Sequence, residues 1–191
     1  MSVAIPSWQI DGVLFDLDGT LVDTAPDLAA ALNAALRHHQ QSELAYQVIR
    51  PIVSNGANAL IKLGFGSQLS PAEHEKITQF FLAHYQQNIA NESALFQGLD
   101  RALEHLENQQ IPWGIVTNKP EFLTTPLLKA LGLYDRAACI VCGDQVSRPK
   151  PHPEPILLAC KKLDISPNNA IYLGDAERDI RAGRLAGLKT I

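Results

Sequence analysis

Helical and strand-like segments alternate from Gly98 to the end of the chain, and this alternation restricts the possible folds more than any other feature of the sequence. The expected helices span residues 99–107, 122–131, 155–163 and 178–186, and the expected strands span residues 113–116, 139–142 and 171–173, with another beginning at 189. A short apolar run, Gly12–Phe15, predicts one more buried strand near the start. Because alternating strands and helices are typical of a parallel sheet covered on both faces, we expect an α/β, doubly wound fold with a Rossmann-like core.

The segment between the first strand and the alternating part has a purely helical pattern. Its expected helices span residues 27–39, 46–63 and 72–89, with no strand between them. We therefore predict a discontinuous α/β core domain, residues 1–23 and 97–191, and a small helical cap domain, residues 24–96, inserted after the first strand. The sequence stops as its last strand begins, so we expect the core to be truncated at its C-terminal end.

Composition and charge exclude several classes of partner. The chain has 191 residues, of which 46% are hydrophobic and 19% charged, an ordinary balance for a globular protein. Its net charge is -4 and it has no block of lysine and arginine, whereas binding to a nucleic-acid backbone needs clustered cations. The N-terminus lacks the pattern of a signal peptide, and no segment has the length of a transmembrane helix. We expect a cytoplasmic monomer or homodimer that binds neither nucleic acid nor a membrane.

The cysteines do not indicate redox or zinc chemistry. Cys139 and Cys142 form a C-x-x-C pattern, but they lie in an apolar run that is expected to be a strand. Because strand side chains alternate, residues three apart face opposite sides of the sheet and cannot share one metal ion. We interpret both as core cysteines.

Side chains that can carry chemistry follow four of the expected strands. They are Asp16 and Asp18 after the first strand, Thr117 and Asn118 after 113–116, Lys150 after 139–142, and Asp175 and Asp179 after 171–173. In open parallel sheets, ligands bind at the carboxyl ends of the strands. We therefore expect these residues, which are far apart in the chain, to meet in one crevice.

The acidic residues predict a metal site. Asp16 and Asp18 start on the same side of an extended chain, and the spacing of Asp175 and Asp179 puts both on one face of a helix. Two carboxylates about 4 Å apart repel by roughly 4 kcal/mol at an effective dielectric of about 20. A divalent cation would offset this repulsion, and ligands that are all oxygen favour Mg²⁺ over zinc. An Asp-Gly turn, and a favourable interaction of Asp179 with the helix dipole, are the alternatives without a metal.

The remaining candidates suit an anion. Lys150 lies between Pro149 and Pro151, so it sits in a stiff segment that cannot be helical and that would hold its charge in one place. The alternative is an ordinary solvated lysine. Thr117 and Asn118 offer hydroxyl and amide donors at a strand-to-helix turn, where phosphate oxygens can be bound.

These motifs, in this order, resemble the haloacid dehalogenase superfamily. The resemblance rests on Asp16-Leu-Asp18-Gly-Thr20-Leu-Val, Val116-Thr117-Asn118, Lys150-Pro and Gly174-Asp175-x-x-x-Asp179. The helical insertion is similar to the small cap of the phosphoglycolate phosphatase branch, and the runs Ser54-Asn55-Gly56-Ala57 and Leu95-Phe96-Gln97-Gly98 favour that branch. The run from Lys150 to Cys160 is especially similar to bacterial N-acetylmuramate 6-phosphate phosphatases.

The resemblance implies a catalytic mechanism with an aspartyl-phosphate intermediate. Asp16 would be the nucleophile, and Asp18 would protonate the leaving oxygen and later deprotonate water. Mg²⁺ would bind the carboxylates of Asp16 and Asp175 and the backbone carbonyl of Asp18. Asp179 would orient Lys150 or a water molecule on the metal.

The resemblance also implies how the substrate is held. Thr117, Asn118 and Lys150 would bind the phosphate, and Asn55 and Gly56 would contact the substrate as the cap closes. The implied substrate is a small phosphorylated metabolite, with N-acetylmuramate 6-phosphate and 2-phosphoglycolate as the leading candidates. A phosphomutase of the β-phosphoglucomutase type and a truncated, non-catalytic protein of the same fold are the alternatives.

Overall fold

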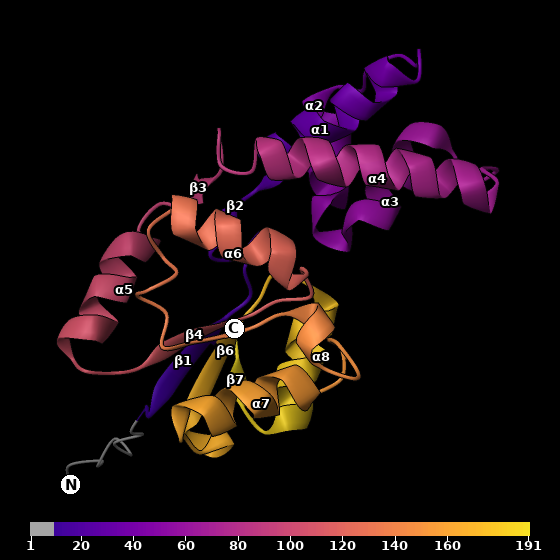
Figure 1. Ribbon diagram of the computed structural model, residues 1–191. Helices are drawn as coiled ribbons and strands as arrows, with labels where there is room; N and C mark the ends of the chain where they lie inside the picture. The colour runs from indigo at the N-terminus through magenta and orange to yellow at the C-terminus, as the bar shows by residue number, and fades with distance from the viewer. Residues whose placement is uncertain (1–9) are drawn as a thin grey trace, which may run out of the picture.

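In the computed structural model, which describes residues 10–191, five strands form a parallel sheet in the order β5-β4-β1-β6-β7 (Figure 1). The strands are β1 (Gly12–Phe15), β4 (Trp113–Val116), β5 (Cys139–Val141), β6 (Ala170–Leu173) and β7 (Lys189–Thr190). Every residue of β1 and β4 is buried, which explains why these strands are continuous apolar runs. The expected fold class is confirmed. The N-terminal segment 1–9, including the part expected not to be a signal peptide, lies outside the described residues.

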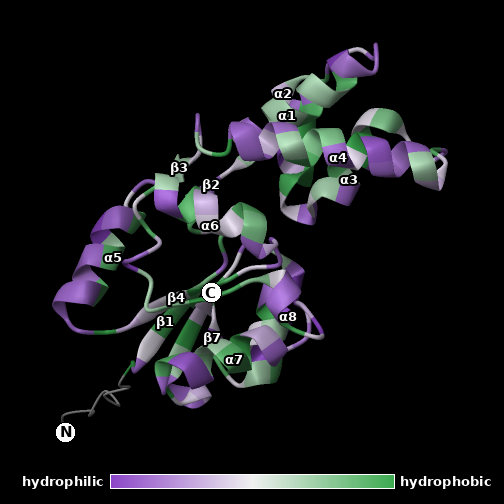
Figure 2. Cartoon of the chain, in the orientation of Figure 1, coloured by the Kyte–Doolittle hydropathy of each residue, from purple (hydrophilic) through white to green (hydrophobic). Residues whose placement is uncertain are grey.

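Helices cover both faces of this sheet. They are α5 (Leu99–Asn108), α6 (Glu121–Ala130), α7 (Glu154–Leu163) and α8 (Glu177–Ala186). Successive side chains of β1 face opposite sides: Val13 and Phe15 join the hydrophobic cluster that includes α5 and α6, and Leu14 joins the one that includes α7 and α8. Figure 2 shows the same division, with hydrophobic strands inside and polar turns on the outside of α5. The sheet therefore presents its carboxyl edge, and neither face, to a ligand.

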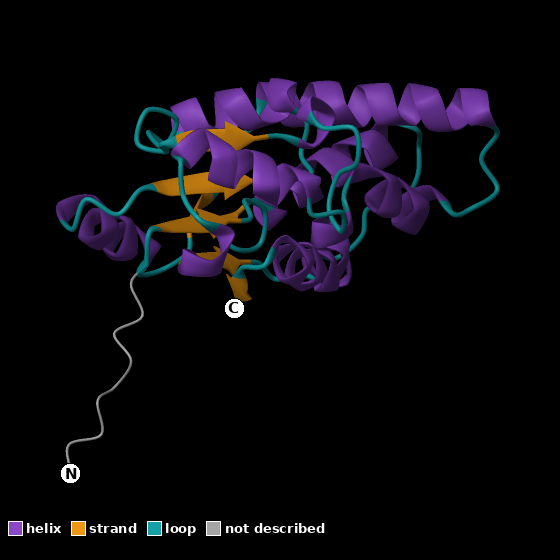
Figure 3. Cartoon of the chain, turned by 90° about the horizontal axis from the view of Figure 1, so that it is seen from below, coloured by secondary structure: helices purple, strands orange, loops and turns teal. Residues whose placement is uncertain are grey.

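A second group of helices lies beyond one end of the sheet. They are α1 (Ala25–His38), α2 (Tyr46–Ile49), α3 (Ala57–Phe65) and α4 (Pro71–Gln87). In Figure 3 the strands lie at one end of the molecule, and the other end holds only helices and loops. Leu32 of α1 and Phe81 of α4 are fully buried in the same hydrophobic cluster. These helices are the segment that we predicted to be the cap, and its status as a separate domain stays a prediction. Within residues 10–191, none of the helices combines the length and apolar character that a membrane span requires.

The prediction of a single helix over residues 46–63 is wrong. The α2 helix ends at Ile49, a 3-10 turn follows over Arg50–Asn55, and α3 begins only at Ala57. Pro51 has no backbone N–H to continue the α-helical hydrogen bonds, and Gly56 adopts a φ of 82°, which glycine tolerates best. This break places the polar residues Ser54 and Asn55, together with Gly56, between two helices.

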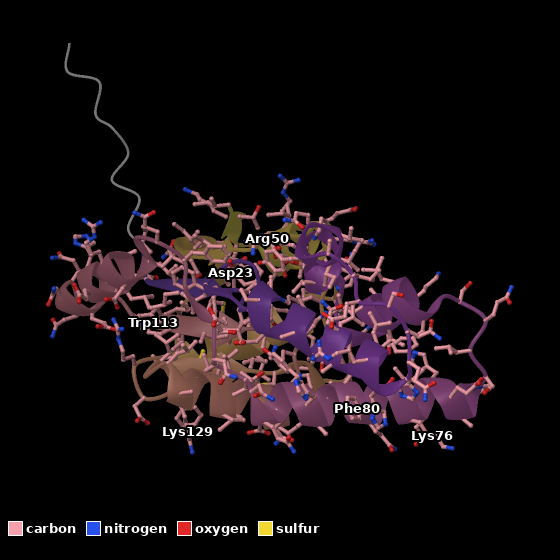
Figure 4. All side chains as sticks on the ribbon, turned by 90° about the horizontal axis from the view of Figure 1, so that it is seen from above. Asp23, Arg50, Lys76, Phe80, Trp113 and Lys129 are labelled. Carbon is pink, nitrogen blue, oxygen red and sulfur yellow. The ribbon has the colours of Figure 1, made fainter. Side chains whose placement is uncertain are left out.

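Two short strands that we did not expect connect the helical segment to the core. They are β2 (Val22–Asp23) and β3 (Ala94–Leu95), and they pair in the antiparallel direction. The chain thus leaves and re-enters the core at neighbouring points, as Figure 1 shows. Arg50 forms an ion pair with Asp23 at 2.9 Å, so the helical segment also contacts this connection directly (Figure 4).

A buried carboxylate ties the two connecting segments together. Asp27, in the first turn of α1, accepts hydrogen bonds from the backbone N–H groups of Glu92 and Ser93, at 3.0 and 2.8 Å, and from the Ser93 hydroxyl at 2.6 Å. The Asp27 side chain is buried, and so is Ser93, which supplies two of these donors. Its hydrogen bonds hold the outgoing helix against the returning chain.

We expect Asp27→Ala to lower the free energy of unfolding by about 3 kcal/mol, because it leaves the two buried donors of Ser93 and the part-buried N–H of Glu92 without their acceptor. Urea denaturation followed by circular dichroism measures this change. Ser93→Ala removes one donor and is expected to cost about 1 kcal/mol. An Asp27→Ala variant as stable as Ser93→Ala would contradict the structural role of this carboxylate.

The cysteines are core residues, as the sequence indicates. Cys139, Cys142 and Cys160 are all buried free thiols. Burial raises the pKa of each thiol to about 11, so they are protonated at neutral pH.

Candidate functional site

The residues that follow β1 and β4 reach one cleft, which has a volume of about 450 Å³ and lies between the core and the inserted helices. From the core it is lined by Asp16, Asp18, Thr117, Asn118, Lys119 and Arg178, and from the inserted segment by Ser54, Asn55, Gly56 and Tyr85, among others. Lys150, from the loop after β5, and Asp179, at the start of α8, reach this site through contacts around Asp16. The convergence expected at the carboxyl edge of the sheet is present.

Lys150 is buried between two carboxylates. Its Nζ atom lies 2.7 Å from Oδ1 of Asp16 and 2.7 Å from Oδ1 of Asp179. The Tyr172 hydroxyl lies 2.8 Å away, and the carbonyl oxygen of Val116 lies 2.9 Å away. The exposed fraction of the side chain is 1% for Lys150, 4% for Asp16 and 0% for Asp179. Such a buried group is stable only while its charges remain paired.

Burial also changes the protonation of this group. Burial raises the pKa of Asp16 from 3.8 to about 6; Lys150 counteracts this rise, and the Asp179 carboxylate adds to it. Asp16 is therefore ionised for the most part at neutral pH. Burial, followed by the charges of Asp16 and Asp179, raises the pKa of Tyr172 well above its usual value, so its hydroxyl stays protonated and donates to Val116 O at 3.0 Å.

Three carboxylates in the described part of the chain form a group that can hold a metal ion. One ligand oxygen from each of Asp16, Asp175 and Asp179 lies within 4.8 Å of the others. Gly19 makes room for this group, because a Cβ atom there would lie 2.5 Å from Oδ2 of Asp175. The donor set consists of carboxylate oxygens, which fits a hard divalent cation.

The Asp18 carboxylate belongs to a different group from the other three. Its Oδ1 atom accepts hydrogen bonds from the Thr24 hydroxyl at 2.6 Å and from Nζ of Lys119 at 2.9 Å. Burial alone would lower the pKa of Lys119, but Asp18 and Tyr85 outweigh it and raise that pKa above its usual value. Of the four aspartates predicted to bind the metal, Asp16, Asp175 and Asp179 bring their carboxylates together, whereas the carboxylate of Asp18 binds Thr24 and Lys119 instead. Metal binding by the Asp18 backbone carbonyl stays a prediction.

The two candidates after β4 have different surroundings. Thr117 is buried and its hydroxyl oxygen accepts from the backbone N–H of Lys119 at 3.1 Å, which leaves the hydroxyl proton to donate elsewhere. The Asn118 side-chain amide forms two hydrogen bonds with the backbone of Lys150, at 2.9 and 3.0 Å. Its amide therefore positions the loop that carries Lys150, and phosphate binding by Asn118 stays a prediction.

The break between α2 and α3 docks on the core. The Ser54 hydroxyl donates to Oδ2 of Asp175 at 2.7 Å, and Nη2 of Arg178 donates to the Ser54 carbonyl at 2.6 Å. The adjacent Asn55 and Gly56 line the cleft. This segment thus reaches the carboxylates that can bind a metal, while substrate binding by Asn55 and Gly56 stays a prediction.

Our sequence reasoning did not assign four of these residues to the site. Lys119 directly follows the predicted Asn118, and Arg178 directly precedes the predicted Asp179, so their positions in the sequence could have indicated them. Ser54 lies beside the predicted Asn55. Tyr85 carries no such signal, because it lies on the buried face of an ordinary amphipathic helix.

Comparison with known proteins identifies the family of the chain. Residues 13–191 match the family of haloacid dehalogenase-like hydrolases. The chain is 42% identical over 182 residues to the N-acetylmuramic acid 6-phosphate phosphatase of Pseudomonas aeruginosa, an alignment that covers 95% of this chain and 80% of the relative. It is 40% identical over 179 residues to the phosphoglycolate phosphatase of Xanthomonas campestris pv. campestris, covering 94% of this chain and 80% of the relative.

Solved structures give the same result. A predicted phosphoglycolate phosphatase from Haemophilus somnus 129PT superimposes with a TM-score of 0.86 and 30% sequence identity, covering 95% of this chain and 84% of the other. A haloacid dehalogenase-like hydrolase from Bacteroides fragilis has a TM-score of 0.82 at 24% identity, with 95% and 86% of the two chains covered. The second likeness is evidence for the fold alone.

Proposed function

Since the chain belongs to the haloacid dehalogenase-like hydrolases, we propose that it is a Mg²⁺-dependent phosphatase that hydrolyses a small phosphate monoester through an aspartyl-phosphate at Asp16. The named relatives, which are phosphatases, support the class of reaction. We propose that residues 24–96 act as a cap that closes over the cleft. A cytoplasmic location and a monomeric or dimeric state stay predictions.

The observation that carries this proposal is the arrangement around Asp16. Its carboxylate lies against the buried cation of Lys150 and within 4.8 Å of the ligand atoms of Asp175 and Asp179. Attack by a carboxylate on a phosphate ester brings negative charges together, and the protein needs fixed positive charge to offset them. Lys150 provides one such charge, and the group of three carboxylates can recruit another.

The proposed reaction has two displacements. In the first, an Asp16 carboxylate oxygen attacks phosphorus, the bond from phosphorus to the ester oxygen breaks, and Asp18 gives its proton to the departing alcohol. In the second, water attacks the aspartyl-phosphate, and Asp18 takes a proton from this water. The bond from phosphorus to Asp16 breaks, and inorganic phosphate and the free carboxylate result.

Other residues bind and orient the phosphoryl group. Lys150 and the Thr117 hydroxyl would donate to phosphate oxygens, and Asn118 would hold the loop of Lys150 in place. Asp16, Asp175 and Asp179 are the side chains that fit Mg²⁺, with the Asp18 carbonyl as a further ligand. Mg²⁺ would supply electrostatic stabilisation of the phosphoryl charge.

The proposed substrates are N-acetylmuramate 6-phosphate and 2-phosphoglycolate, after the names of the relatives. A cleft of about 450 Å³ suits a small metabolite. A screen of phosphorylated metabolites with Mg²⁺, read as released phosphate, tests the proposal. Products that are isomerised sugar phosphates, without free phosphate, would support a phosphomutase instead.

We expect a chelator to abolish phosphate release, because the carboxylates around Asp16 then lack their cation. Addition of excess Mg²⁺ should restore the initial rate, whereas Na⁺ at equal ionic strength should not. Initial rates with p-nitrophenyl phosphate measure this effect. Full activity in the presence of chelator would rule out the role of the metal.

A further inference from the structure

Lys119 lines the cleft with a buried side chain, and it connects three separate segments. Lys119 itself lies in the turn after β4. Its Nζ atom donates a hydrogen bond to Oδ1 of Asp18, which lies in the loop after β1, at 2.9 Å. It also donates to the hydroxyl of Tyr85, which lies in α4 of the inserted segment, at 3.0 Å. The exposed fraction of its side chain is 6%. Its Nζ atom also lies 4.6 Å from the centre of the Tyr85 ring, within the range of a cation–π interaction.

The hydrogen bonds of Asp18 are concentrated on one of its two oxygens. Thr24 and Lys119 both donate to Oδ1. The other oxygen, Oδ2, is the one left to exchange a proton with a substrate in the cleft that Asp18 lines. A carboxyl group whose orientation is fixed in this way transfers a proton from a defined position.

We propose that Lys119 is a positioning residue for Asp18, and that Tyr85 links it to the inserted helices. This inference rests on the proposed function, in which Asp18 protonates the leaving group. Lys119 holds Asp18 Oδ1, and Tyr85 holds Lys119 from α4. The proton-donating geometry of Asp18 is therefore complete only when the inserted helices are docked on the core.

An exposed lysine beside a tyrosine ring provides a comparison in the same chain. Lys129 lies 5.0 Å from the ring centre of Tyr134. Lys129 is exposed and points outward in Figure 4, and it is not among the residues that line the 450 Å³ cleft. Lys119 differs from it in being buried, in binding a catalytic candidate and in joining the core to α4.

The test compares esters that need a proton donor to different extents. The leaving group of p-nitrophenyl phosphate is nitrophenolate, which is a stable anion. The leaving group of benzyl phosphate is an alkoxide, which needs a proton as it leaves. We expect Lys119→Met to lower kcat/KM for benzyl phosphate about 100-fold, and that for p-nitrophenyl phosphate less than about fivefold, because loss of general acid catalysis acts on the poor leaving group. Lys119→Arg should recover part of the loss, and Lys129→Met should leave both values within about twofold.

Tyr85→Phe keeps the ring and removes only the hydroxyl, so it provides the same test with little risk to folding. We expect it to show a smaller loss with the same preference for benzyl phosphate. Equal losses on both esters, or no loss in either variant, would overturn the role of Lys119 while leaving the phosphatase assignment in place. If the wild-type protein with Mg²⁺ released no phosphate from any ester, the proposed function would fail and this inference with it.

Discussion

Asp16→Asn is expected to lower phosphate release by roughly 10⁴-fold or more, as removal of a nucleophile does in other enzymes. An amide cannot form the aspartyl-phosphate, and the second displacement then has no substrate. The rate of phosphate release with Mg²⁺ measures the loss. Asp18→Asn should also abolish turnover, because it removes the proton donor but keeps the shape of the side chain.

The fold should survive the Asp16→Asn change. Burial raises the pKa of the Asp16 carboxyl to about 6, which means that its ionised form is unfavourable in this position, and a neutral amide of the same shape avoids that penalty. Lys150 keeps its contact with Asp179. We expect the free energy of unfolding to change by less than about 1 kcal/mol. Asp135→Asn, at an exposed position, is the matched control; substantial turnover by Asp16→Asn would remove Asp16 from the mechanism.

Lys150→Met is expected to reduce both stability and activity. Without the ammonium group, the buried carboxylates of Asp16 and Asp179 face each other with no cation between them. Breaking such a buried group typically costs about 3–5 kcal/mol, and loss of a fixed charge beside a transferring phosphoryl group lowers kcat by about 10²–10³-fold. Urea denaturation in the absence of Mg²⁺ and phosphate release in its presence measure the two effects.

A double variant separates charge from packing. If uncompensated charge causes the instability, then Lys150→Met combined with Asp179→Asn should be more stable than Lys150→Met alone, since one of the two carboxylates is gone. Lys162→Met, at an exposed lysine that donates to Ile140 O, is the control and should change stability little. A Lys150→Met protein as stable as the wild type would contradict the buried ion network.

The sequence was sufficient to predict the strands of the core and the convergence of their terminal residues. Local hydrophobic patterns identify buried strands, and parallel strands connected by helices must end at the same edge. Asp16 and Lys150, which are 134 positions apart, are therefore in contact for a reason that can be read from the chain. The resemblance to known motifs added the expected roles of these residues.

The sequence did not reveal with which groups each side chain forms its hydrogen bonds and ion pairs. The pairing of Lys119 with Tyr85, the use of Asn118 on the backbone of Lys150, and the separation of Asp18 from the other carboxylates all depend on contacts between segments brought together by folding. The break at Gly56 also needed the structure, although Pro51 and Gly56 were visible beforehand.

The physical reason is that secondary structure depends on residues close together in the sequence, whereas side-chain contacts depend on residues that folding brings together. The pattern that makes a strand or a helix lies within a few neighbouring residues, so the sequence by itself determined the α/β core and which residues reach its edge. A buried carboxylate or ammonium group forms hydrogen bonds with the groups that the packed chain brings within about 3 Å, so its partners depend on the packing. Only the tertiary structure could therefore divide the four aspartates into three whose carboxylates lie close enough together to hold a metal ion, and one, Asp18, that pairs with Lys119.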